Sequence, residues 1–258
     1  MVRNVDKKVS IVIASHDFID SLITCIKKVD EHTERELLEE VVVVDNGSEH
    51  TYTFEELREL TSLSLSLIHL ETNTSFAYAN NRGAQAARGC YLCFMNNDIE
   101  VLEKWLEPLY EIIDNEERIG AVGPKMIFPD GSIQFAGYER DPHTQFQRHR
   151  WRGYPSHLIP EVNVAGPVSA LTGACLLVKK ENAYFDERYW YGCEDVDLCV
   201  RLKQQGTIIY YQPKSVVIHR EGTTRFSGSV VVEYERNREL FRQKWGRGWE
   251  DLLWKVVT

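Results

Sequence analysis

Short apolar runs alternate with amphipathic stretches in the first half of the chain. Residues 9–14 and 41–44 are β-branched runs with the length and composition of buried strands. Between them, Leu22, Ile26 and Val29 recur at i, i+4 and i+7, the spacing of one helical face. Strands that alternate with helices are the sequence form of βαβ units. The pattern therefore predicts an α/β fold with a mostly parallel sheet flanked by helices.

The same alternation continues to about residue 118. Leu102, Leu106, Leu109 and Ile113 keep a helical spacing, so we expect an amphipathic helix that begins near residue 102. Gly89 stands where a glycine commonly ends a helix. The other elements predicted in this region are a short helix at residues 54–60, a strand at 65–70, a helix at 76–88 and a strand at 91–95.

Beyond residue 118 the pattern changes to hairpin-like segments. Residues 129–132, Pro-Asp-Gly-Ser, form a turn signal between two apolar segments. Residues 139–163 are polar, aromatic and without a clear period, so we expect a long, mobile surface loop. We further expect strands at residues 121–128, 133–138 and 168–178, a helix at 195–205, a strand at 207–211 closed by Pro213, and a strand-like segment at 215–218.

Composition and charge narrow the class of protein. The chain has 258 residues, 43% hydrophobic and 27% charged, as in ordinary globular proteins. Its net charge of -9 argues against general binding to nucleic acid. No apolar run approaches the ~20 residues of a membrane span and no signal peptide is visible, so we expect a cytoplasmic location. The sequence shows no repeat and no linker, which predicts one domain.

Polar residues follow three of the predicted strands. Ligands bind beyond the carboxyl ends of strands in open α/β sheets, so these positions are candidates for binding. Asp98 and its amide neighbours offer the oxygen donors that Mg²⁺ or Mn²⁺ prefers, although Asp98 could instead cap a helix beginning at Leu102. Asp45 fits a turn residue and a ligand contact equally well. The three groups are Ser15-His16-Asp17, Asp45-Asn46-Gly47-Ser48 and Asn96-Asn97-Asp98.

A second acidic cluster begins the helix predicted at residues 195–205. Glu194 and Asp195 are free to face a cleft, whereas Asp197 has Arg201 at i+4, and we expect those two side chains to pair. His219 follows a strand-like segment and fits either a structural role or metal binding. Neither the G-x-G-x-x-G pattern nor a P-loop is present, so a phosphate-containing ligand would be bound mainly through a cation.

Several segments, taken together and in order, resemble the family 2 inverting glycosyltransferases. The match runs from about Val9 to His219, and residues 237–245 resemble the tail of bacterial rhamnosyltransferase-like members. The segments are VSIVIAS at 9–15, VVVVDNGS at 41–48, NNRG at 80–83, MNND at 95–98 and CEDVDLCVR at 193–201.

The resemblance implies the GT-A fold, a Rossmann-like and mostly parallel sheet, and it implies roles for particular residues. Asp98 matches the last position of the metal-binding D-x-D motif, and His219 matches a histidine that joins the metal shell in some members. Asp195 matches the catalytic base and Glu194 its neighbour. The remaining implied contacts are Ser15, Asp17, Asp45, Asn81 and Asn97 for the nucleotide and Gly173, Trp190 and Tyr191 for the acceptor.

The resemblance also implies how the chain is divided and what it binds. A single domain would have a nucleotide-binding half at about 1–118, an acceptor-binding half at about 119–225 and a helical tail at 226–258. With Mn²⁺ or Mg²⁺, it would transfer a sugar from a UDP-, dTDP- or GDP-sugar to a glycan, lipid-linked or protein acceptor, with or without peripheral contact to the inner face of the plasma membrane. A nucleotidyltransferase and a catalytically silent glycan- or partner-binding module are the alternatives.

Overall fold

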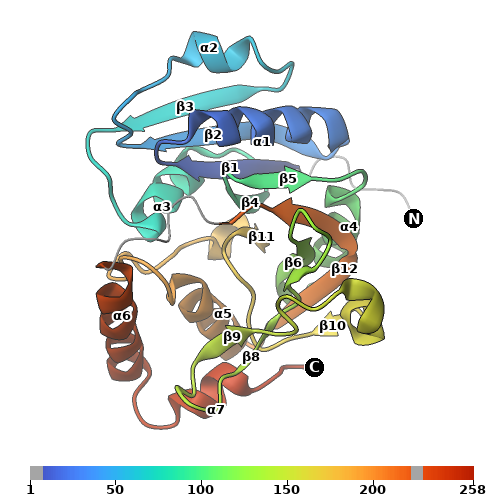
Figure 1. The fold of residues 1–258 in the computed structure, drawn as a ribbon, viewed down its shortest axis with the longest axis vertical. Helices are drawn as coiled ribbons and strands as arrows, with labels where there is room; N and C mark the ends of the chain where they lie inside the picture. The colour runs from blue at the N-terminus through green and yellow to red at the C-terminus, as the bar shows by residue number, and fades with distance from the viewer. Residues whose placement is uncertain (1–7, 222–228) are drawn as a thin grey trace.

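A mixed sheet of ten strands runs through the residues that the computed structural model describes, which are 8–221 and 229–258 (Figure 1). Its strands are β1 (Val9–Ser15), β2 (Leu38–Asn46), β3 (Leu65–Leu70), β4 (Tyr91–Asn96), β5 (Ile99–Val101), β6 (Ile119–Ile127), β7 (Ile133–Phe135), β10 (Gly166–Pro167), β11 (Cys175–Lys179) and β12 (Ile208–His219). The main path is β10-β12-β6-β11-β4-β1-β2-β3, with β5 paired to β12 and β7 to β6. The adjacent strands in the series β4-β1-β2-β3 are parallel to each other, and β6 and β12 are also parallel. Strand β11 is antiparallel to both of its neighbours, β4 and β6.

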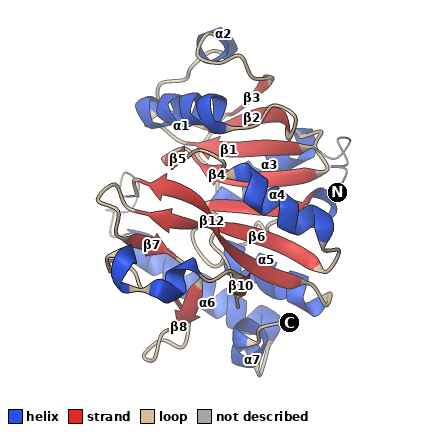
Figure 2. Ribbon diagram, turned by 90° about the vertical axis from the view of Figure 1, so that its right-hand side faces the viewer, coloured by secondary structure: helices blue, strands red, loops and turns tan. Residues whose placement is uncertain are grey.

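Helices cover both faces of this sheet (Figure 2). They are α1 (Ile19–His32), α2 (Phe54–Arg58), α3 (Phe76–Ala86), α4 (Leu106–Asn115), α5 (Glu194–Gln204), α6 (Ser229–Trp245) and α7 (Trp249–Trp254). In Figure 2, α4 lies in front of the sheet while α3 and α5 lie behind it, and Trp105 before α4 donates a hydrogen bond to Thr33 after α1. The prediction of an α/β fold with a mostly parallel sheet is confirmed.

A glycine allows α3 to pack closely against the sheet. A Cβ on Gly83 would come within 2.3 Å of Val12 Cγ1, so this helix packs against β1 more closely than a larger side chain would allow. The prediction for this helix was slightly too long, because it ends at Ala86 and Ala87 takes extended backbone angles. Gly89 does not end it; its backbone instead passes next to β1, where its N–H donates to Ser10 Oγ.

The helix predicted from Leu102 begins four residues later than expected. Ile99 to Val101 form the short strand β5, which pairs antiparallel with the end of β12. Lys104 then takes a left-handed conformation (φ 57°), and α4 starts at Leu106. Leu106, Leu109 and Ile113 therefore lie on one face of α4 as the spacing predicted, whereas Leu102 lies before the helix, directly after the additional strand β5.

The expectation of a mobile loop at residues 139–163 is wrong. Strands β8 (Tyr138–Arg140) and β9 (Gln147–His149) form an antiparallel hairpin, and the 3₁₀ turns η1 (Ser156–Leu158) and η2 (Pro160–Asn163) follow it. Phe146 is fully buried and stacks on Trp249 of α7, with 4.4 Å between ring centroids. A sequence without a clear period folds here because the C-terminal tail covers it.

Two strands also differ from prediction. The segment predicted to end at Pro213 continues to His219 as the single strand β12, with a register shift between Gln212 and Val216. Proline lacks the N–H of a regular ladder, and an irregularity of this kind is where a strand tolerates it. The strand predicted at residues 168–178 is shorter, because residues 168–174 form a loop before β11.

The parallel strands end at one edge of the sheet. Ser15 at the end of β1, Asn46 at the end of β2 and Asn96 at the end of β4 therefore lie near one another, as the rule for α/β sheets requires. His219 ends β12 and is paired with Ile99, directly after Asp98. The edge gathers nearly all of the polar groups singled out from the sequence.

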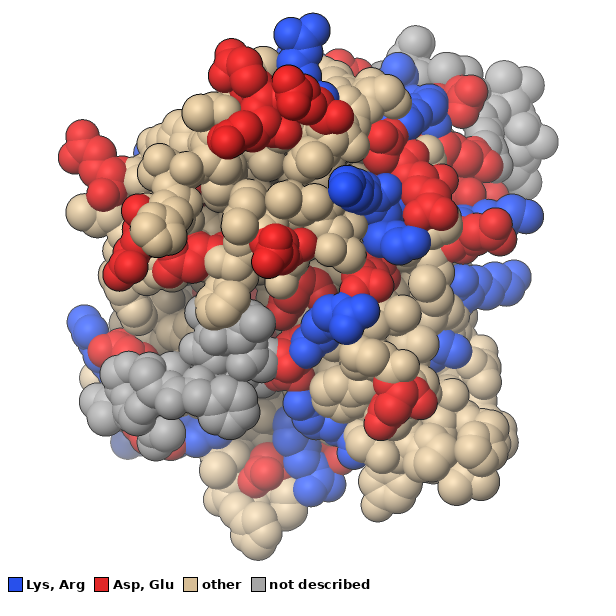
Figure 3. Space-filling view, turned by 45° about the horizontal axis from the view of Figure 1, so that its top comes forward, with Lys and Arg blue, Asp and Glu red and all other residues tan. Residues whose placement is uncertain are grey.

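The surface is mainly acidic. On the face drawn in Figure 3, red acidic side chains spread over the upper part and the blue ones stand in short groups beside them, in keeping with the net charge of -9. No helix among residues 8–221 and 229–258 is long and apolar enough to cross a membrane. Residues 222–228, where the predicted acceptor-binding half meets the predicted tail, lie outside the described residues.

Candidate active site

Two adjoining cavities open at the carboxyl edge of the sheet. Phe76, Asn96 and Tyr191 line both, so a ligand could extend from one to the other. The first, which we call the strand-end cavity, is also lined by Ala14, Ser15, His16, Phe18, Asn46, Asn73, Thr74, Asn97 and Trp190. The second, which we call the carboxylate cavity, is also lined by Gln134, Tyr138, His149, Thr172, Gly173, Ala174, Gly192, Cys193, Glu194, Asp195, His219 and Tyr234.

Hydrogen bonds between neighbouring strand ends hold the wall of the strand-end cavity. Asn97 Nδ2 donates to Ser15 Oγ at 3.0 Å. Asn46 accepts from the Thr74 backbone N–H and donates to the Thr74 carbonyl, which fixes the loop before α3. Gly47 is required there, because a Cβ on it would lie 2.2 Å from the Thr72 carbonyl carbon. Ser15 and Asn97, two of the residues predicted to contact the nucleotide, thus line this cavity.

Asp17 and Asp45 are not among the residues that line either cavity. Asp45 is fully buried, accepts from the backbone and hydroxyl of Ser48, and lies 2.9 Å from His69 Nδ1. Asp17 accepts from the backbone N–H of Glu49. Neither carboxylate lines the two cavities, so the structure shows them stabilising the loops after β1 and β2.

Asn81, also predicted at the nucleotide, is placed away from both cavities. Its side chain is buried, donates to the Phe185 carbonyl and to Glu187, and accepts from the Phe185 N–H. This exchange anchors α3 to the segment that leads into α5. The structure thus brings Ser15, Asn97, Trp190 and Tyr191 together but leaves Asn81 in a packing position.

Asp98 and His219 come together although they are distant in sequence. The β5–β12 ladder places them there, and the Arg220 N–H donates to the Asp98 carbonyl. Asp98 Oδ1 lies 3.1 Å from His219 Nε2, and both side chains are buried. Asp98 Oδ1 and His219 Nδ1 find no hydrogen-bond partner in the part of the chain that the structure describes.

This pair fits a divalent cation. Two ligands on adjacent corners of an octahedral ion, each about 2.1 Å from it, are about 3 Å apart, which the Asp98–His219 separation matches. A carboxylate oxygen suits both Mg²⁺ and Mn²⁺, whereas an imidazole nitrogen favours a transition metal, so the pair fits Mn²⁺ better than Mg²⁺. Within the described residues no group of three or more His, Cys, Asp and Glu side chains is gathered for a metal, so a cation here would need further ligands from a substrate or water.

Asp195 is buried in the carboxylate cavity and held by three donors. Its Oδ2 accepts from the Gly173 N–H and from the Tyr138 hydroxyl, each at 3.1 Å, and its Oδ1 accepts from the Val196 N–H at 2.7 Å. Burial raises the pKa of Asp195, while these hydrogen bonds oppose the rise. The side chain is therefore fixed in orientation and more basic than an exposed aspartate.

Glu194 differs from its neighbour in its hydrogen bonding. Its Oε2 is buried without a partner among the described residues. Burial, with the charge of Asp195 adding to it, raises the pKa of Glu194 to about 8. Paired acids whose environments separate their pKa values commonly divide the roles of proton acceptor and proton carrier. Burial thus raises the pKa of both carboxyl groups, and the donors around Asp195 oppose the rise there.

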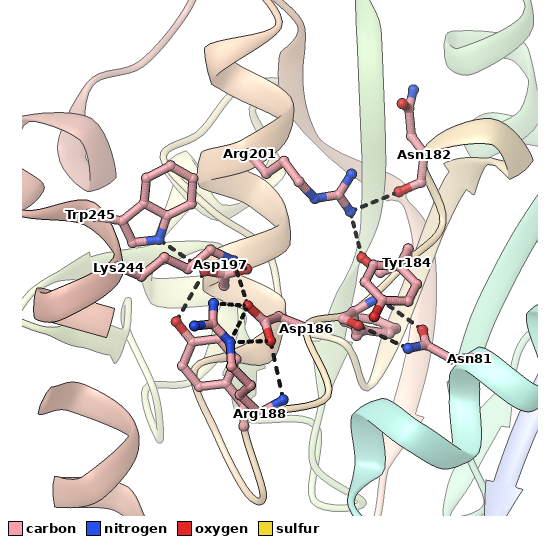
Figure 4. Close-up of polar contacts among 11 residues, drawn as sticks. Asn81, Asn182, Tyr184, Asp186, Arg188, Asp197, Arg201, Lys244 and Trp245 are labelled. Carbon is pink, nitrogen blue, oxygen red and sulfur yellow. Dashed lines mark hydrogen bonds and ion pairs between the residues drawn. The ribbon is translucent and has the colours of Figure 1, made fainter. Parts of the chain in front are cut away.

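The predicted pairing of Asp197 with Arg201 is wrong (Figure 4). Asp197 accepts from Lys244 Nζ at 2.7 Å, from Trp245 Nε1 at 2.9 Å and from the Tyr189 hydroxyl at 3.0 Å. Arg201 instead donates to backbone carbonyls in the segment before α5. The guanidinium one helical turn away is engaged by these carbonyls, and the buried carboxylate is satisfied instead by two donors from the tail and by Tyr189.

These contacts belong to a larger set that joins α6 to the segment before α5. Lys244 also contacts Asp186 at 2.8 Å, and Asn237 donates to the carbonyls of Tyr191 and Gly192. Tyr191 lines both cavities. The tail therefore holds a segment that carries part of the site.

Three of the carboxylate-cavity residues that the sequence analysis missed matter most for its geometry. Tyr138 binds Asp195, Phe76 separates the two cavities, and Gln134 lies in the wall formed by β7. A Cβ on Gly173 would come within 3.1 Å of the Phe76 ring, so the glycine allows the ring and the loop to approach. The only sequence signal near Gln134 and Tyr138 was the turn at residues 129–132, which predicts a hairpin that contains them.

The family model for glycosyl transferase family 2 matches residues 10–182. The chain therefore belongs to glycosyl transferase family 2, and it is a glycosyltransferase. This assignment agrees with a GT-A fold whose polar residues meet at the carboxyl edge of the sheet.

Curated relatives are longer than this chain. The O-antigen biosynthesis protein RfbC of Myxococcus xanthus is 29% identical over 86% of this chain, which spans 18% of that protein. An N-acetylglucosaminyl-diphospho-decaprenol L-rhamnosyltransferase of Mycobacterium tuberculosis is 28% identical over 60% of this chain and 55% of its own length.

Solved structures share the fold. GalNAc-T7 with UDP, GalNAc and Mn²⁺ superposes with a TM-score of 0.72 and 20% identity, over 93% of this chain and 50% of that one. The mannosyltransferase PcManGT of Pyrobaculum calidifontis, in complex with GDP-Man and Mn²⁺, has a TM-score of 0.58 and 16% identity, over 85% and 59%. These likenesses confirm the predicted GT-A fold.

Proposed function

We propose that this glycosyltransferase is metal-dependent and inverting, and that it transfers a sugar from a nucleotide-diphosphate sugar to a hydroxyl group. One observation carries the proposal: the carboxylate of Asp195 and the imidazole of His219, which lies against Asp98, line the same cavity. That cavity adjoins the strand-end cavity, in which Ser15 and Asn97 would contact the nucleotide.

Asp195 would act as the general base. It accepts the proton of the acceptor hydroxyl as the oxygen attacks the anomeric carbon, and the bond from that carbon to the diphosphate breaks. Attack on the face opposite the leaving group inverts the anomeric centre. The donors from Gly173, Val196 and Tyr138 keep the carboxylate oriented. Asp98 and His219 would hold Mn²⁺ or Mg²⁺, which neutralises charge on the departing diphosphate.

Similar proteins suggest the substrates. The GalNAc-T7 and PcManGT structures contain UDP and GDP-Man respectively, each with Mn²⁺, so we propose a UDP-, dTDP- or GDP-sugar as donor. The names of the bacterial relatives refer to O-antigen and to a diphospho-decaprenol acceptor. We therefore propose a glycan or lipid-linked acceptor in polysaccharide or cell-wall synthesis, with a protein acceptor as the alternative. The work would take place in the cytoplasm, at the inner face of the plasma membrane for a lipid-linked acceptor.

The test is hydrolysis of a panel of UDP-, dTDP- and GDP-sugars by the wild-type protein, with Mn²⁺ or with a chelator. We expect metal-dependent release of the nucleoside diphosphate, reduced at least about 100-fold by Asp98→Ala, a loss of about 2.7 kcal/mol. Asp195→Asn should keep nucleotide binding but abolish transfer to any acceptor found. Glu36→Ala is a matched control, because Glu36 is exposed just before β2 and therefore at the opposite edge of the sheet.

Two results would count against this proposal. Hydrolysis that persists at the wild-type rate in Asp98→Ala or in chelator would exclude the metal site. Unchanged transfer by Asp195→Asn would exclude Asp195 as the base. Release of a nucleoside monophosphate and a sugar 1-phosphate, in place of a nucleoside diphosphate and free sugar, would indicate cleavage within the diphosphate, the bond on which a nucleotidyltransferase acts.

A further inference from the structure

Gln134 is a buried amide in the wall of the carboxylate cavity. It lies on β7 with 1% of its surface exposed. Its Nε2 donates to Glu221 Oε2 at 3.0 Å. A carboxylate can only accept this hydrogen bond, so the contact determines which end of the amide is the nitrogen. The end of the amide that does not contact Glu221 is therefore the carbonyl oxygen, Oε1.

The partner of Gln134 is itself held in place. Arg152 donates to Glu221 Oε2 at 2.6 Å, and the Arg152 guanidinium lies 4.8 Å from the centre of the Phe128 ring. Glu221 is therefore anchored on its far side by a charged pair. Through it, the Gln134 amide is fixed rather than free to rotate.

Gln134 Oε1 has no hydrogen-bond partner in the described part of the chain, and it is buried. Buried carbonyl groups are almost always satisfied, so an unsatisfied one in a cavity wall points to a ligand. Glu194 Oε2 and His219 Nδ1, both from residues that line the same cavity, are also without a partner among the described residues. A ligand of this cavity thus meets an acceptor oxygen at Gln134 in addition to the Asp195 carboxylate.

The surrounding side chains suit a sugar. Tyr138 packs edge-on against Phe135 and His149, with ring centroids 5.0 and 5.3 Å away, and its hydroxyl binds Asp195. Aromatic faces with a few fixed polar groups are typical of binding sites for small polar molecules. A sugar has several hydroxyl groups, so one can be deprotonated while a second is bound.

We propose that Gln134 Oε1 accepts a hydrogen bond from a second hydroxyl, or from an amide N–H, of the acceptor sugar. The inference rests on the proposed function, in which the carboxylate cavity receives the acceptor. Gln134 selects an acceptor by a hydroxyl other than the one that attacks. A site built to bind a hydroxyl rejects analogues that lack it, because the amide oxygen is then left unpaired.

The test uses Gln134→Met, which keeps the side-chain length and removes the amide. The probes are the methyl glycosides of N-acetylglucosamine, galactose and rhamnose, whose binding is measured by saturation-transfer NMR with UDP and Mn²⁺ present. We expect the dissociation constant of the bound glycoside to rise about tenfold, equal to about 1.4 kcal/mol. UDP affinity should stay unchanged, because the strand-end cavity does not include Gln134.

Gln147→Met is the matched control. Gln147 is also buried, and its Oε1 also lacks a partner among the described residues, but it does not line this cavity. Equal affinities in wild type and Gln134→Met, the same loss in both variants, or no binding of any glycoside to the wild type would overturn the inference. Failure of the proposed function is distinguishable, because wild-type hydrolysis of nucleotide sugars would then itself be absent.

Discussion

Glu194 and Asp195 are adjacent carboxylic acids in unequal surroundings. Asp195 accepts three hydrogen bonds, whereas Glu194 Oε2 has no partner among the described residues. Hydrogen bonds stabilise the charged form and burial without them stabilises the neutral form. The pKa of both carboxyl groups is raised by burial, and the two differ in the donors that oppose this rise.

Glu194→Gln should make the protein more stable near pH 8. The folded pKa of Glu194 is raised from 4.5 to about 8, so the folded state holds more protons than the unfolded state between these values. The contribution of Glu194 to the free energy of unfolding is therefore fully present below pH 4.5 and is lost as the pH rises through 8. Thermal melting at pH 5, 6.5 and 8 should show a difference between the variant and wild type that grows with pH.

A constant difference over this range would contradict the assigned pKa. Glu187→Gln is a suitable control, because Glu187 is partly exposed and in contact with Arg82. Its melting temperature relative to wild type should not follow the pH dependence seen for Glu194→Gln.

At the scale of elements, hydrogen bonds from α6 fix the position of α5 and of the segment before it. Lys244 and Trp245 satisfy the buried Asp197, and Asn237 binds the backbone of Tyr191 and Gly192. Cys193 at the N-terminal boundary of α5 takes a left-handed conformation (φ 73°) that is uncommon for a side chain with a Cβ. The contacts from α6 hold this conformation directly before Glu194 and Asp195.

Lys244→Met should destabilise the fold. It leaves the Asp197 carboxylate, 2% exposed at the side chain, without its cation, at a cost of about 1–3 kcal/mol. Urea unfolding followed by circular dichroism measures the change. Lys28→Met is the control, because its pair with Glu31 is solvent-exposed and should contribute less than about 0.5 kcal/mol. Equal effects of the two substitutions would show that Asp197 does not depend on Lys244.

The sequence predicted those elements and residues whose positions follow from local pattern. The β-branched runs predicted β1 and β2, and the short apolar segments at 65–70 and 91–95 predicted β3 and β4. Residues at the ends of parallel strands, such as Ser15 and Asn97, met at one edge because strand direction alone brings them there. Tyr138 was missed because its contact with Asp195 depends on how a hairpin packs against a helix from elsewhere in the chain. Asp197 was misassigned for the same reason, since its donors come from the tail.

For the whole molecule, the tail and the β8–β9 hairpin share one aromatic cluster. Phe146 stacks on Trp249, and Phe241 meets the same indole edge-on at 5.8 Å. Figure 1 shows α6 and α7 lying beside α5 and this hairpin. The cluster joins the C-terminal helices to the part of the molecule that carries Tyr138 and Gln134.

Calorimetry should therefore show a single unfolding transition that includes the tail. Trp249→Ala removes a buried indole, which costs about 3–5 kcal/mol, and should lower the midpoint on the order of 10 °C for a chain of this size. Trp190→Ala is the control, because Trp190 is 48% exposed and should leave the midpoint nearly unchanged. Two separate transitions, or an unmoved midpoint in Trp249→Ala, would show that the tail unfolds independently.

Phe76 is a common wall of both cavities, and the glycine at 173 is what allows its ring to lie there. An alanine at 173 would press on the ring within 3.1 Å, so a change meant to reshape one cavity would deform the other. A substitution at either position would therefore alter both cavities at once. Attempts to graft a new specificity onto this scaffold should exchange residues 76 and 173 as a pair rather than one at a time.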